Sequence, residues 1–322
     1  MDAIGGYFEL ADWEAGRSFP HTDGVLLNTG RNALEFILRN IGEVRGVYLP
    51  YYTCEVVLEP LLKLGIPWSF YHVNATFEIE DDIQLQDGEY LVANNYFGLK
   101  DTYMEILAAR YGDRLIVDCS QAFFAKPILG IKTFYSARKF IGVADGGVAY
   151  IQKIRTSAYE TECTVAHDSH LYIRKELGAE SGFVEYKRNE AKLDNQPIRW
   201  MSDTTKRILA HIDYENIISK RRANYKYLHE RLRERNYLQL PEMDSFVCPM
   251  VYPFLSSNGS LKEKLIAAKV YVATYWPNVM EWCKLEDLEY QLAESTVYLP
   301  IDQRYGEKEM TKILNVVYES GV

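Results

Sequence analysis

The segment from 115 to 150 constrains the fold more strongly than any other part of this chain. It opens with an apolar run that ends in Asp118, which predicts a buried strand with a carboxylate at its carboxyl end. Lys139 follows in a loop between two further predicted strands, with Ser136 before it and the glycine pair 146–147 after it. Ligands of open α/β sheets bind at the carboxyl ends of the strands, so Asp118 and Lys139 are candidate site residues.

Short apolar runs alternate with amphipathic stretches on both sides of this segment. Leu34, Ile37, Leu38 and Ile41 fall at i, i+3, i+4 and i+7 and predict one apolar helix face. The alternation indicates an α/β fold with a mostly parallel central sheet and helices on its faces. The predicted strands cover 46–50, 68–73, 90–93, 114–118, 131–136 and 147–151, and the predicted helices cover 31–41, 54–64, 101–111, 203–236 and 307–319.

Breaker residues and changes of composition divide the chain into three parts. Residues 1–24 carry several glycines and a proline and are expected to form an irregular N-terminal arm. Residues 25–205 are expected to form a large domain, and residues 206–322 a smaller C-terminal α+β domain. The long helix predicted over 203–236 would connect the two domains, and its basic run at 220–222 predicts a solvated helix face.

Composition and charge argue against several classes of function. The 322 residues are 48% hydrophobic and 25% charged, which is ordinary for a globular protein. The net charge of −9 argues against partners such as nucleic acid or an anionic membrane surface. No apolar run reaches the length of about 18 residues that a membrane helix needs.

Cysteine and histidine usage predicts neither a disulfide framework nor a metal site. The five cysteines are scattered without metal-ligand spacing, and no signal peptide is recognisable, which together favour reduced thiols and a cytoplasmic location. His167 and His170 could ligate a metal, but no third ligand is evident. A polar surface loop is therefore the favoured interpretation of this pair.

Lys139 and Asp118 together favour one cofactor chemistry. Pyridoxal 5′-phosphate (PLP) is an aldehyde that a lysine carries as a Schiff base, and its ring nitrogen needs a protein partner such as a carboxylate. Either residue alone would mean little, because most lysines are solvated and a strand-end aspartate is often a helix cap. The pair, placed around a predicted sheet edge, points to PLP.

A phosphate site is predicted where a strand turns into a helix at residues 28–33. A helix N-terminus presents free N–H groups and a partial positive charge, and Gly30 allows close backbone approach. Thr29 could donate its hydroxyl to the phosphate or could simply cap the helix. Arg31 and Arg138 could bind a carboxylate or phosphate of a substrate, or they could face outward.

A series of short motifs occurs in order over nearly the whole chain. They are Asn28-Thr-Gly-Arg-Asn-Ala-Leu34, Leu49-Pro-Tyr-Tyr-Thr53, Asn94-Asn-Tyr-Phe-Gly98, Asp118-Cys-Ser-Gln-Ala122, Lys139 with the glycine pair 146–147, Arg199-Trp-Met-Ser202, Arg221-Arg-Ala-Asn-Tyr225 and Tyr298-Leu-Pro-Ile301. Their order and spacing resemble those of the DegT/StrS family of PLP-dependent sugar aminotransferases. The resemblance implies the fold-type I architecture, in which a mostly parallel central sheet flanked by helices is followed by a smaller C-terminal domain.

The resemblance also implies roles for the site residues. Lys139 would carry the cofactor and shuttle a proton between Cα of the substrate and C4′ of the cofactor, while Asp118 would face the ring nitrogen. Gln121 would lie near the 3′ oxygen of the ring. The phosphate would be held by the backbone N–H groups of Gly30 and Arg31 and by the hydroxyl of Ser136. The implied cofactor-binding residues are Gly30, Arg31, Cys54, Asp118, Gln121, Ser136 and Lys139, with no metal.

Cys54 and the lysine loop depart from the family pattern. Cys54 lies where relatives stack an aromatic ring on the cofactor, and a thiol offers much less contact area. We expect an aromatic side chain from the neighbouring strand ends to cover the cofactor instead; the candidates are Tyr51, Tyr52, Tyr96 and Phe97. A slip of one or two residues, which would make Tyr52 the true counterpart, is the alternative. The loop has Ser136-Ala-Arg-Lys139 where the family has Ser-Phe-x-x-x-Lys.

The resemblance implies a homodimeric aminotransferase that takes an amino group from an amino acid, glutamate being usual in the family. The acceptor would be a keto group, most plausibly on a nucleotide-linked sugar for polysaccharide biosynthesis. A PLP-dependent lyase, dehydratase or amino-acid-transforming enzyme is an alternative, although the family's dehydratases replace the lysine with His. A non-catalytic binding protein on the same scaffold is a third, disfavoured by Lys139 and Asp118. The polar segment 154–200 could supply groups that reach the neighbouring site of a dimer.

Overall fold

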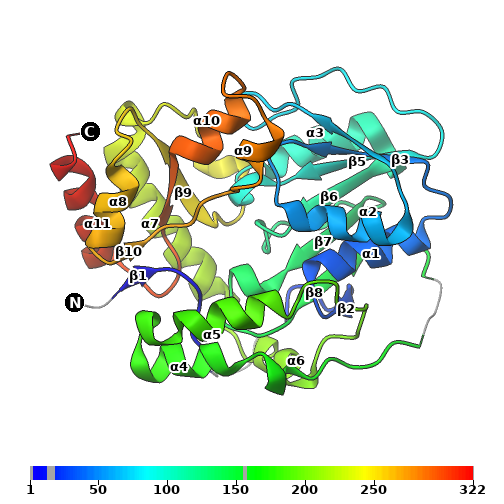
Figure 1. Ribbon diagram of the computed structural model, residues 1–322, viewed down its shortest axis with the longest axis horizontal. Coiled ribbons are helices and arrows are strands. Elements are labelled where there is room, and N and C mark those ends of the chain that lie inside the picture. Colours follow the sequence, from blue (N-terminus) through cyan, green and yellow to red (C-terminus); the bar gives the residue numbers. More distant parts are fainter. Residues whose placement is uncertain (1–2, 13–18, 155–157, 322) are drawn as a thin grey trace.

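The computed structural model describes residues 3–12, 19–154 and 158–321. Its main feature is a seven-stranded sheet with the order β2-β8-β7-β6-β5-β3-β4. The strand β8 pairs antiparallel with both of its neighbours, whereas the other pairs are parallel. The predicted mostly parallel α/β sheet is confirmed. Figure 1 shows the sheet with α1, α2 and α3 on one side of the molecule and α7, α8 and α11 on the other.

The strands of the described chain form this large sheet and two small ones. In the small sheets β1 pairs parallel with β10, and β9 pairs antiparallel with β11. The strands are β1 (Ile4–Gly5), β2 (Val25–Leu27), β3 (Gly46–Pro50), β4 (Trp68–Tyr71), β5 (Glu89–Asn94), β6 (Leu115–Cys119), β7 (Lys132–Ser136), β8 (Gly147–Tyr150), β9 (Val251–Leu255), β10 (Val270–Tyr271) and β11 (Thr296–Pro300).

Helices alternate with these strands along the first half of the chain and dominate the second half. They are α1 (Gly30–Asn40), α2 (Leu58–Leu64), α3 (Asp101–Tyr111), α4 (Ser169–Leu177), α5 (Ala179–Ala191), α6 (Asp203–Leu209), α7 (Tyr214–Leu232), α8 (Leu261–Ala267), α9 (Val279–Trp282), α10 (Leu288–Ser295) and α11 (Glu307–Glu319). The predicted helices over 31–41, 101–111 and 307–319 correspond to α1, α3 and α11. The predicted helix 54–64 begins instead with a 3₁₀ turn at Glu55–Val57, and Pro60 lies in the first turn of α2.

Both faces of the large sheet are buried, because successive side chains of a strand point to opposite faces. Val92, Ile116 and Phe134 pack under α1 and α2 in one apolar cluster. Leu91, Val117 and other residues of the opposite face belong to a second cluster, which also contains side chains of α3, α7 and β9. The polar residues at the carboxyl ends of β5, β6 and β7, namely Asn94, Asp118 and Ser136, lie at the edge where the site residues are.

The single helix predicted over 203–236 is wrong. The chain forms α6 and then α7, separated by residues 210–213. Asp213 ends the interruption by capping α7, since its side chain accepts a hydrogen bond from the Asn216 N–H. Apolar periodicity continues through the break and hides it in the sequence. Two further helices, α4 and α5, lie in the segment 154–200, for which no element was predicted.

The N-terminal arm is fastened to the C-terminal part of the chain. Within the predicted arm 1–24, residues 1–2 and 13–18 lie outside the described residues, while Ile4–Gly5 forms β1 beside β10. Because one apolar cluster joins the sheet to the C-terminal elements, the division at residue 205 into two domains stays a prediction.

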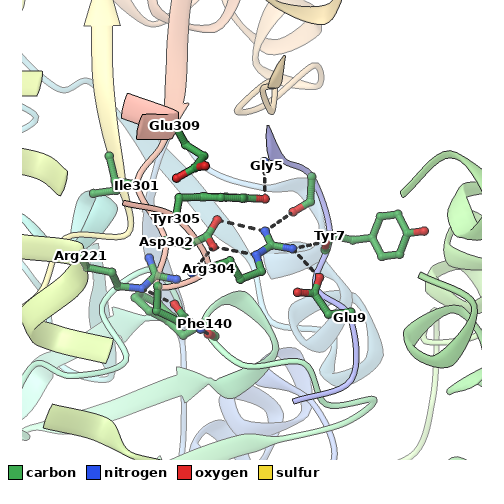
Figure 2. A network of polar contacts seen from close by, with 12 residues as sticks. Gly5, Tyr7, Glu9, Phe140, Arg221, Ile301, Asp302, Arg304, Tyr305 and Glu309 are labelled. Atoms are coloured by element: carbon green, nitrogen blue, oxygen red, sulfur yellow. Dashed lines mark hydrogen bonds and ion pairs between the residues drawn. The ribbon is translucent and has the colours of Figure 1, made fainter. Parts of the chain in front are cut away.

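A network of charged groups ties the arm to the segment before α11 (Figure 2). The Arg304 guanidinium donates to both carboxylate oxygens of Asp302, at 2.7 and 3.0 Å, and to Glu9 at 2.9 Å. It also donates to the Tyr7 carbonyl at 3.1 Å. Burial alone would raise the pKa of Asp302, but the charge and hydrogen bonds of Arg304 hold this pKa below its usual value.

The basic run at 220–222 is only in part the solvated face that was predicted, because Lys220 is exposed but Arg221 is not. Arg221 is fully buried and donates to Gln303 at 2.9 Å and to the Met250 carbonyl at 2.8 Å. Its guanidinium lies over the ring of Phe140, 4.6 Å from the centroid (Figure 2). Because Phe140 directly follows Lys139, this contact connects α7 to the lysine loop.

Arg304→Ala should destabilise the protein strongly at neutral pH. It leaves the buried carboxylate of Asp302 without its partner, and removing one member of a buried ion pair costs about 3 kcal/mol or more. The stabilisation from Asp302 is fully present above the ordinary carboxyl pKa of about 4. It is lost as the pH falls from there through the lowered pKa that Asp302 has in the folded protein. Unfolding free energies of the two proteins should therefore differ most at neutral pH and converge in acid.

The matched control is Arg45→Ala, which breaks an exposed pair with Glu43. This variant should unfold like the wild type, since exposed ion pairs contribute little. Equal stability of Arg304→Ala and the wild type at pH 7 would show that the network does not hold the arm.

Candidate functional site

A cavity of about 230 Å³ lies at the carboxyl edge of the large sheet. Its wall is built from the ends of β3, β5, β6 and β7, the start of α1, the lysine loop, the end of α5 and the segment before α9. All of the sequence-predicted site residues line it together: Gly30, Arg31, Cys54, Asp118, Gln121, Ser136 and Lys139. Their predicted roles remain to be tested, but the fold brings every one of them to the same place.

Asp118 lies near the end of β6, next to Asn94 of β5 in the strand register. The Ser120 N–H donates to its carboxylate at 2.7 Å. Burial raises the pKa of Asp118 above its usual value, while the charge of Lys139 and the contacts with Ser120 lower it. A further positive group beside this carboxylate would therefore favour its ionised form.

Lys139 ends the 3₁₀ turn Ala137–Lys139 that follows β7. Within the described ranges its amine makes no hydrogen bond or ion pair, although its charge acts on both Asp118 and Cys54. Burial raises the pKa of the Cys54 thiol, and Lys139 lowers it. The amine is thus available to a ligand in the cavity.

The start of α1 forms one part of the cavity wall, through Thr29, Gly30 and Arg31. Thr29 is the N-cap and accepts a hydrogen bond from the Asn32 N–H at 3.1 Å, so its capping role is the one observed. The N–H groups of Gly30 and Arg31 make no hydrogen bond with other described residues. A Cβ atom on Gly30 would lie 3.4 Å from the Ser120 hydroxyl and 3.5 Å from Ser136 Cβ, so two serines flank this helix end.

Two amide side chains leave polar atoms unpaired in the cavity wall. Gln121 accepts from the Phe97 N–H at 3.2 Å, but its buried Nε2 donor has no partner among the described residues. Asn94 donates to the Thr53 hydroxyl at 3.0 Å, and its buried Oδ1 likewise lacks a partner there. An unpaired buried polar atom is costly, which makes these atoms natural contacts for a polar ligand.

The two arginines of the wall differ in how far they are already neutralised. Arg31 pairs with Glu59 and Asp194, each at 2.8 Å, and these carboxylates raise its pKa against the effect of burial. The charge of its side chain is therefore already balanced by two protein carboxylates, which bind the same terminal nitrogen. Arg138 pairs with Glu190 of α5.

The aromatic residues expected to replace the ring missing at Cys54 are not in the cavity wall. None of Tyr51, Tyr52, Tyr96 and Phe97 lines it. Tyr52 instead packs edge-on against Trp276, with ring centroids 5.2 Å apart, and it is Trp276 that lines the cavity. Asn278 fixes this segment by donating to the Thr53 carbonyl at 2.9 Å.

Sequence reasoning missed Trp276 because it lies more than 200 positions from Cys54, and no local pattern marks it. Asn94, Ser120 and Glu190 also line the cavity without having been predicted as site residues. Asn94 and Ser120 could have been found, since each adjoins a strand end at the same sheet edge. Glu190 could not, because the helix α5 was not predicted.

Residues next to the lysine loop and at the start of α6 fix the elements that carry the site. Asp145 accepts hydrogen bonds of 2.7 Å from both the N–H and the hydroxyl of Ser202, the N-cap of α6. The backbone of Gly147 passes so close to α1 that a Cβ atom there would lie 2.1 Å from the Thr29 carbonyl oxygen. A larger residue at 147 would therefore push the start of α1 away from β8.

A larger hollow of about 880 Å³ lies at the opposite end of α1. Its charged side chains pair with each other, Glu35 with Arg39 at 2.7 Å and with Lys63 at 3.6 Å. The smaller cavity holds the unpaired polar atoms and the free amine, so it is the better candidate for chemistry despite its size.

The structure contains neither a metal cluster nor a membrane helix in its described ranges. No group of three or more His, Cys, Asp and Glu side chains there could hold a metal ion. Burial and the charge of Arg138 lower the pKa of His170 to about 4, and His170 contacts Asn189 at 3.0 Å. No helix of this part of the chain is long and apolar enough to cross a membrane. All five cysteines are free thiols.

Solved structures share this fold over almost the whole chain. The aminotransferase TlmJ from Streptoalloteichus hindustanus matches with a TM-score of 0.70 and 13% identity, over 99% of this chain and 98% of that one. DesI, solved in the presence of its TDP-sugar product, matches with a TM-score of 0.63 and 14% identity, over 91% and 79%. A DegT DnrJ EryC1 StrS aminotransferase from Brucella abortus matches with a TM-score of 0.61 and 16% identity, over 92% and 85%.

These likenesses confirm the predicted fold-type I architecture. No family model matches the sequence, and no curated protein matches it.

Proposed function

We propose that this protein is a PLP-dependent aminotransferase of the DegT/StrS type. The observation that carries the proposal is the free amine of Lys139 beside Asp118, in a cavity whose other walls offer unpaired donors. Its fold is that of solved aminotransferases, and its motifs resemble those of the family. The acceptor we propose is a keto group on a nucleotide-linked sugar, with an amino acid, most simply glutamate, as donor.

The residues of the cavity fit PLP in size and in chemistry. The N–H groups of Gly30 and Arg31, with the Ser136 hydroxyl, would hold the phosphate at the positive end of α1. The unpaired Nε2 of Gln121 would donate to the 3′ oxygen of the ring. Asp118 would pair with the ring nitrogen, whose positive charge would offset the burial that now raises the pKa of this carboxyl.

When bound, PLP supplies an electron sink for the negative charge that develops at the substrate α-carbon. The chain would supply the rest. Lys139 Nζ would remove the proton from Cα of the amino donor. In the second half of the reaction it would return a proton to the carbon of the acceptor that receives the amino group. Asp118 would stay ionised and keep the ring nitrogen protonated. The closely packed wall at Trp276 would limit the access of water.

The alternatives proposed from the sequence use the same cavity. A PLP-dependent lyase or another amino-acid-transforming enzyme would need the same Lys139 and Asp118, and half-reactions with a panel of amino acids separate these from transamination. A non-catalytic binding protein would have no use for the free amine. The reduced thiols agree with the proposed cytoplasmic location.

Lys139→Ala and Asp118→Asn should separate cofactor attachment from cofactor activation. Purified protein should show the visible absorbance of lysine-bound PLP, and borohydride should fix the cofactor to Lys139; the alanine variant should lose both signals.

Asp118→Asn should keep the cofactor but lose at least about 100-fold in turnover, because a charge that stabilises the transition state is gone. Peptide mapping that finds the cofactor on a different lysine would refute the assignment of Lys139, and near-full turnover of Asp118→Asn would leave Asp118 a structural acid.

Trp276 should cover the cofactor in place of the aromatic residue missing at Cys54. Trp276→Ala should weaken PLP binding up to about tenfold, the contribution of one aromatic contact, while Trp276→Phe should retain most of it. Trp282→Ala serves as the control, since Trp282 packs on Phe70 and does not line the cavity. Energy transfer from tryptophan to bound PLP should fall more in the Trp276 variants than in Trp282→Ala, because transfer weakens steeply with distance. If Cys54→Ala alone weakens binding, the thiol itself holds the ring.

We also propose that the protein forms a two-fold symmetric homodimer. The helix pair α4–α5 presents exposed apolar side chains, among them Leu177, Phe183 and Val184, which a partner would cover. The end of the same pair lines the cavity through Glu190. Sedimentation at micromolar concentration should give a dimer, and Phe183→Asp combined with Val184→Asp should give a monomer. An active wild-type monomer would overturn this proposal.

A further inference from the structure

We propose that Arg138 binds the α-carboxylate of the amino donor, and that Glu190 occupies this carboxylate site until the donor arrives. The inference rests on the proposed aminotransferase function and names the substrate group that the Lys139 side of the cavity would recognise. It is carried by the hydrogen bonds and ion pairs of the charged groups that line the cavity.

Arg138 is held beside Lys139 but is only partly satisfied. It lies in the same 3₁₀ turn and lines the cavity. One terminal nitrogen of its guanidinium pairs with a carboxylate oxygen of Glu190. Its Nε is buried and has no partner among the described residues. A planar guanidinium can bind two oxygens of one carboxylate side by side, so the unpaired Nε marks an incompletely used binding edge.

The other two cationic groups of the cavity wall already have a partner or a proposed role. The wall contains three, Arg31, Arg138 and Lys139, within the described chain. Arg31 is held by two carboxylates, Glu59 and Asp194, at 2.8 Å each. Lys139 has to remain free to react with an aldehyde. Arg138 is therefore the cation that can exchange its partner for a substrate anion.

The position of Arg138 favours a carboxylate over a diphosphate. In an amino acid the carboxylate is bonded directly to Cα, the atom at which Lys139 would act, so its binding group must lie next to the lysine. In a nucleotide-linked sugar several bonds separate the diphosphate from the reacting ring carbon. The residue adjacent to the lysine thus matches the amino donor, and a carboxylate, that of Glu190, already occupies the guanidinium.

Charge balance gives the two residues opposite effects on binding. Without donor, Glu190 pairs with Arg138, while Lys139 acts on Asp118 through its charge alone. A donor carboxylate that replaces Glu190 leaves the charge at Arg138 balanced, and the Glu190 side chain, 36% exposed, can turn to solvent. Arg138 is then a binding group and Glu190 a competitor of the substrate, whereas in a purely structural ion pair both residues would support the site equally.

The test compares Arg138→Gln, Glu190→Gln and a control, Arg188→Gln, which breaks an exposed pair with Glu185 on the same helix α5. Calorimetry on the purified proteins measures the binding of succinate, an unreactive dicarboxylate, and of inorganic pyrophosphate. Stopped-flow half-reactions compare L-glutamate with its α-amide, which lacks the charged group. Circular dichroism checks that each variant is folded, and Arg138→Lys provides a second variant that keeps the charge but loses the planar fork.

We expect Arg138→Gln to weaken succinate binding by about 10- to 100-fold, the loss typical of a charge-assisted hydrogen bond. The same variant should slow the half-reaction with L-glutamate and leave that with the α-amide unchanged. The succinate affinity of Arg138→Lys should lie between that of Arg138→Gln and that of the wild type. Glu190→Gln should bind succinate more tightly than the wild type, and Arg188→Gln should match the wild type.

Three results would overturn the inference. They are equal losses with L-glutamate and its α-amide in Arg138→Gln, weaker succinate binding in Glu190→Gln, and a loss of pyrophosphate binding in Arg138→Gln while succinate binding persists. The last result would assign Arg138 to the diphosphate of the acceptor. Succinate binding does not depend on turnover, so it tests Arg138 even if the absorbance of PLP is absent and the proposed function fails.

Discussion

Burial of the large sheet on both faces is the constraint on which the rest of this structure depends. Apolar side chains of the inner strands alternate between two clusters, one under α1 and α2 and one shared with α3 and the C-terminal elements. Polar groups in the middle of such strands would lose water without gaining partners. The carboxyl edge is the place where Asp118, Asn94 and Ser136 can occur, and the cavity forms there because α1 and the lysine loop leave it open.

Charge pairing then decides what each group at this edge can do. Arg31 has two carboxylate partners that already balance the charge of its side chain. Burial raises the pKa of Asp118 despite the charge of Lys139 and the contacts with Ser120, and Lys139 has a free amine. Arg138 lies between these extremes, with one carboxylate partner and one unpaired buried nitrogen. The two arginines of this cavity thus differ in how completely their guanidinium groups are paired.

The C-terminal half of the chain closes the site from the other side. Trp276 lines the cavity, and Asn278 ties its segment to the Thr53 carbonyl. Gln303 donates to the Phe140 carbonyl at 2.7 Å, directly after Lys139, while Arg221 covers the Phe140 ring. The lysine loop is therefore held between the large sheet and α7. Substitutions at Gln303 or Arg221 should accordingly alter the position of Lys139.

The sequence by itself determined the central sheet and seven residues of the cavity. Period-two alternation, helix periodicity and the ends of apolar runs are local signals, and strand ends of a parallel sheet meet at one edge wherever the strands lie in sequence. Asp118, Gln121, Ser136 and Lys139 were found in this way together with the family resemblance. The break between α6 and α7 escaped because the apolar pattern continues across it.

Only the tertiary structure decided which distant groups complete the site. Trp276 and Glu190 reach the cavity through packing of elements far from the strand ends, and nothing in their neighbouring residues signals this. The pairing of Arg31 with Glu59 and Asp194, which separates it from Arg138, is likewise a property of three distant segments. The sequence sets the chemical type of a side chain, but which of its polar atoms stay unpaired depends on the neighbours that folding places beside it.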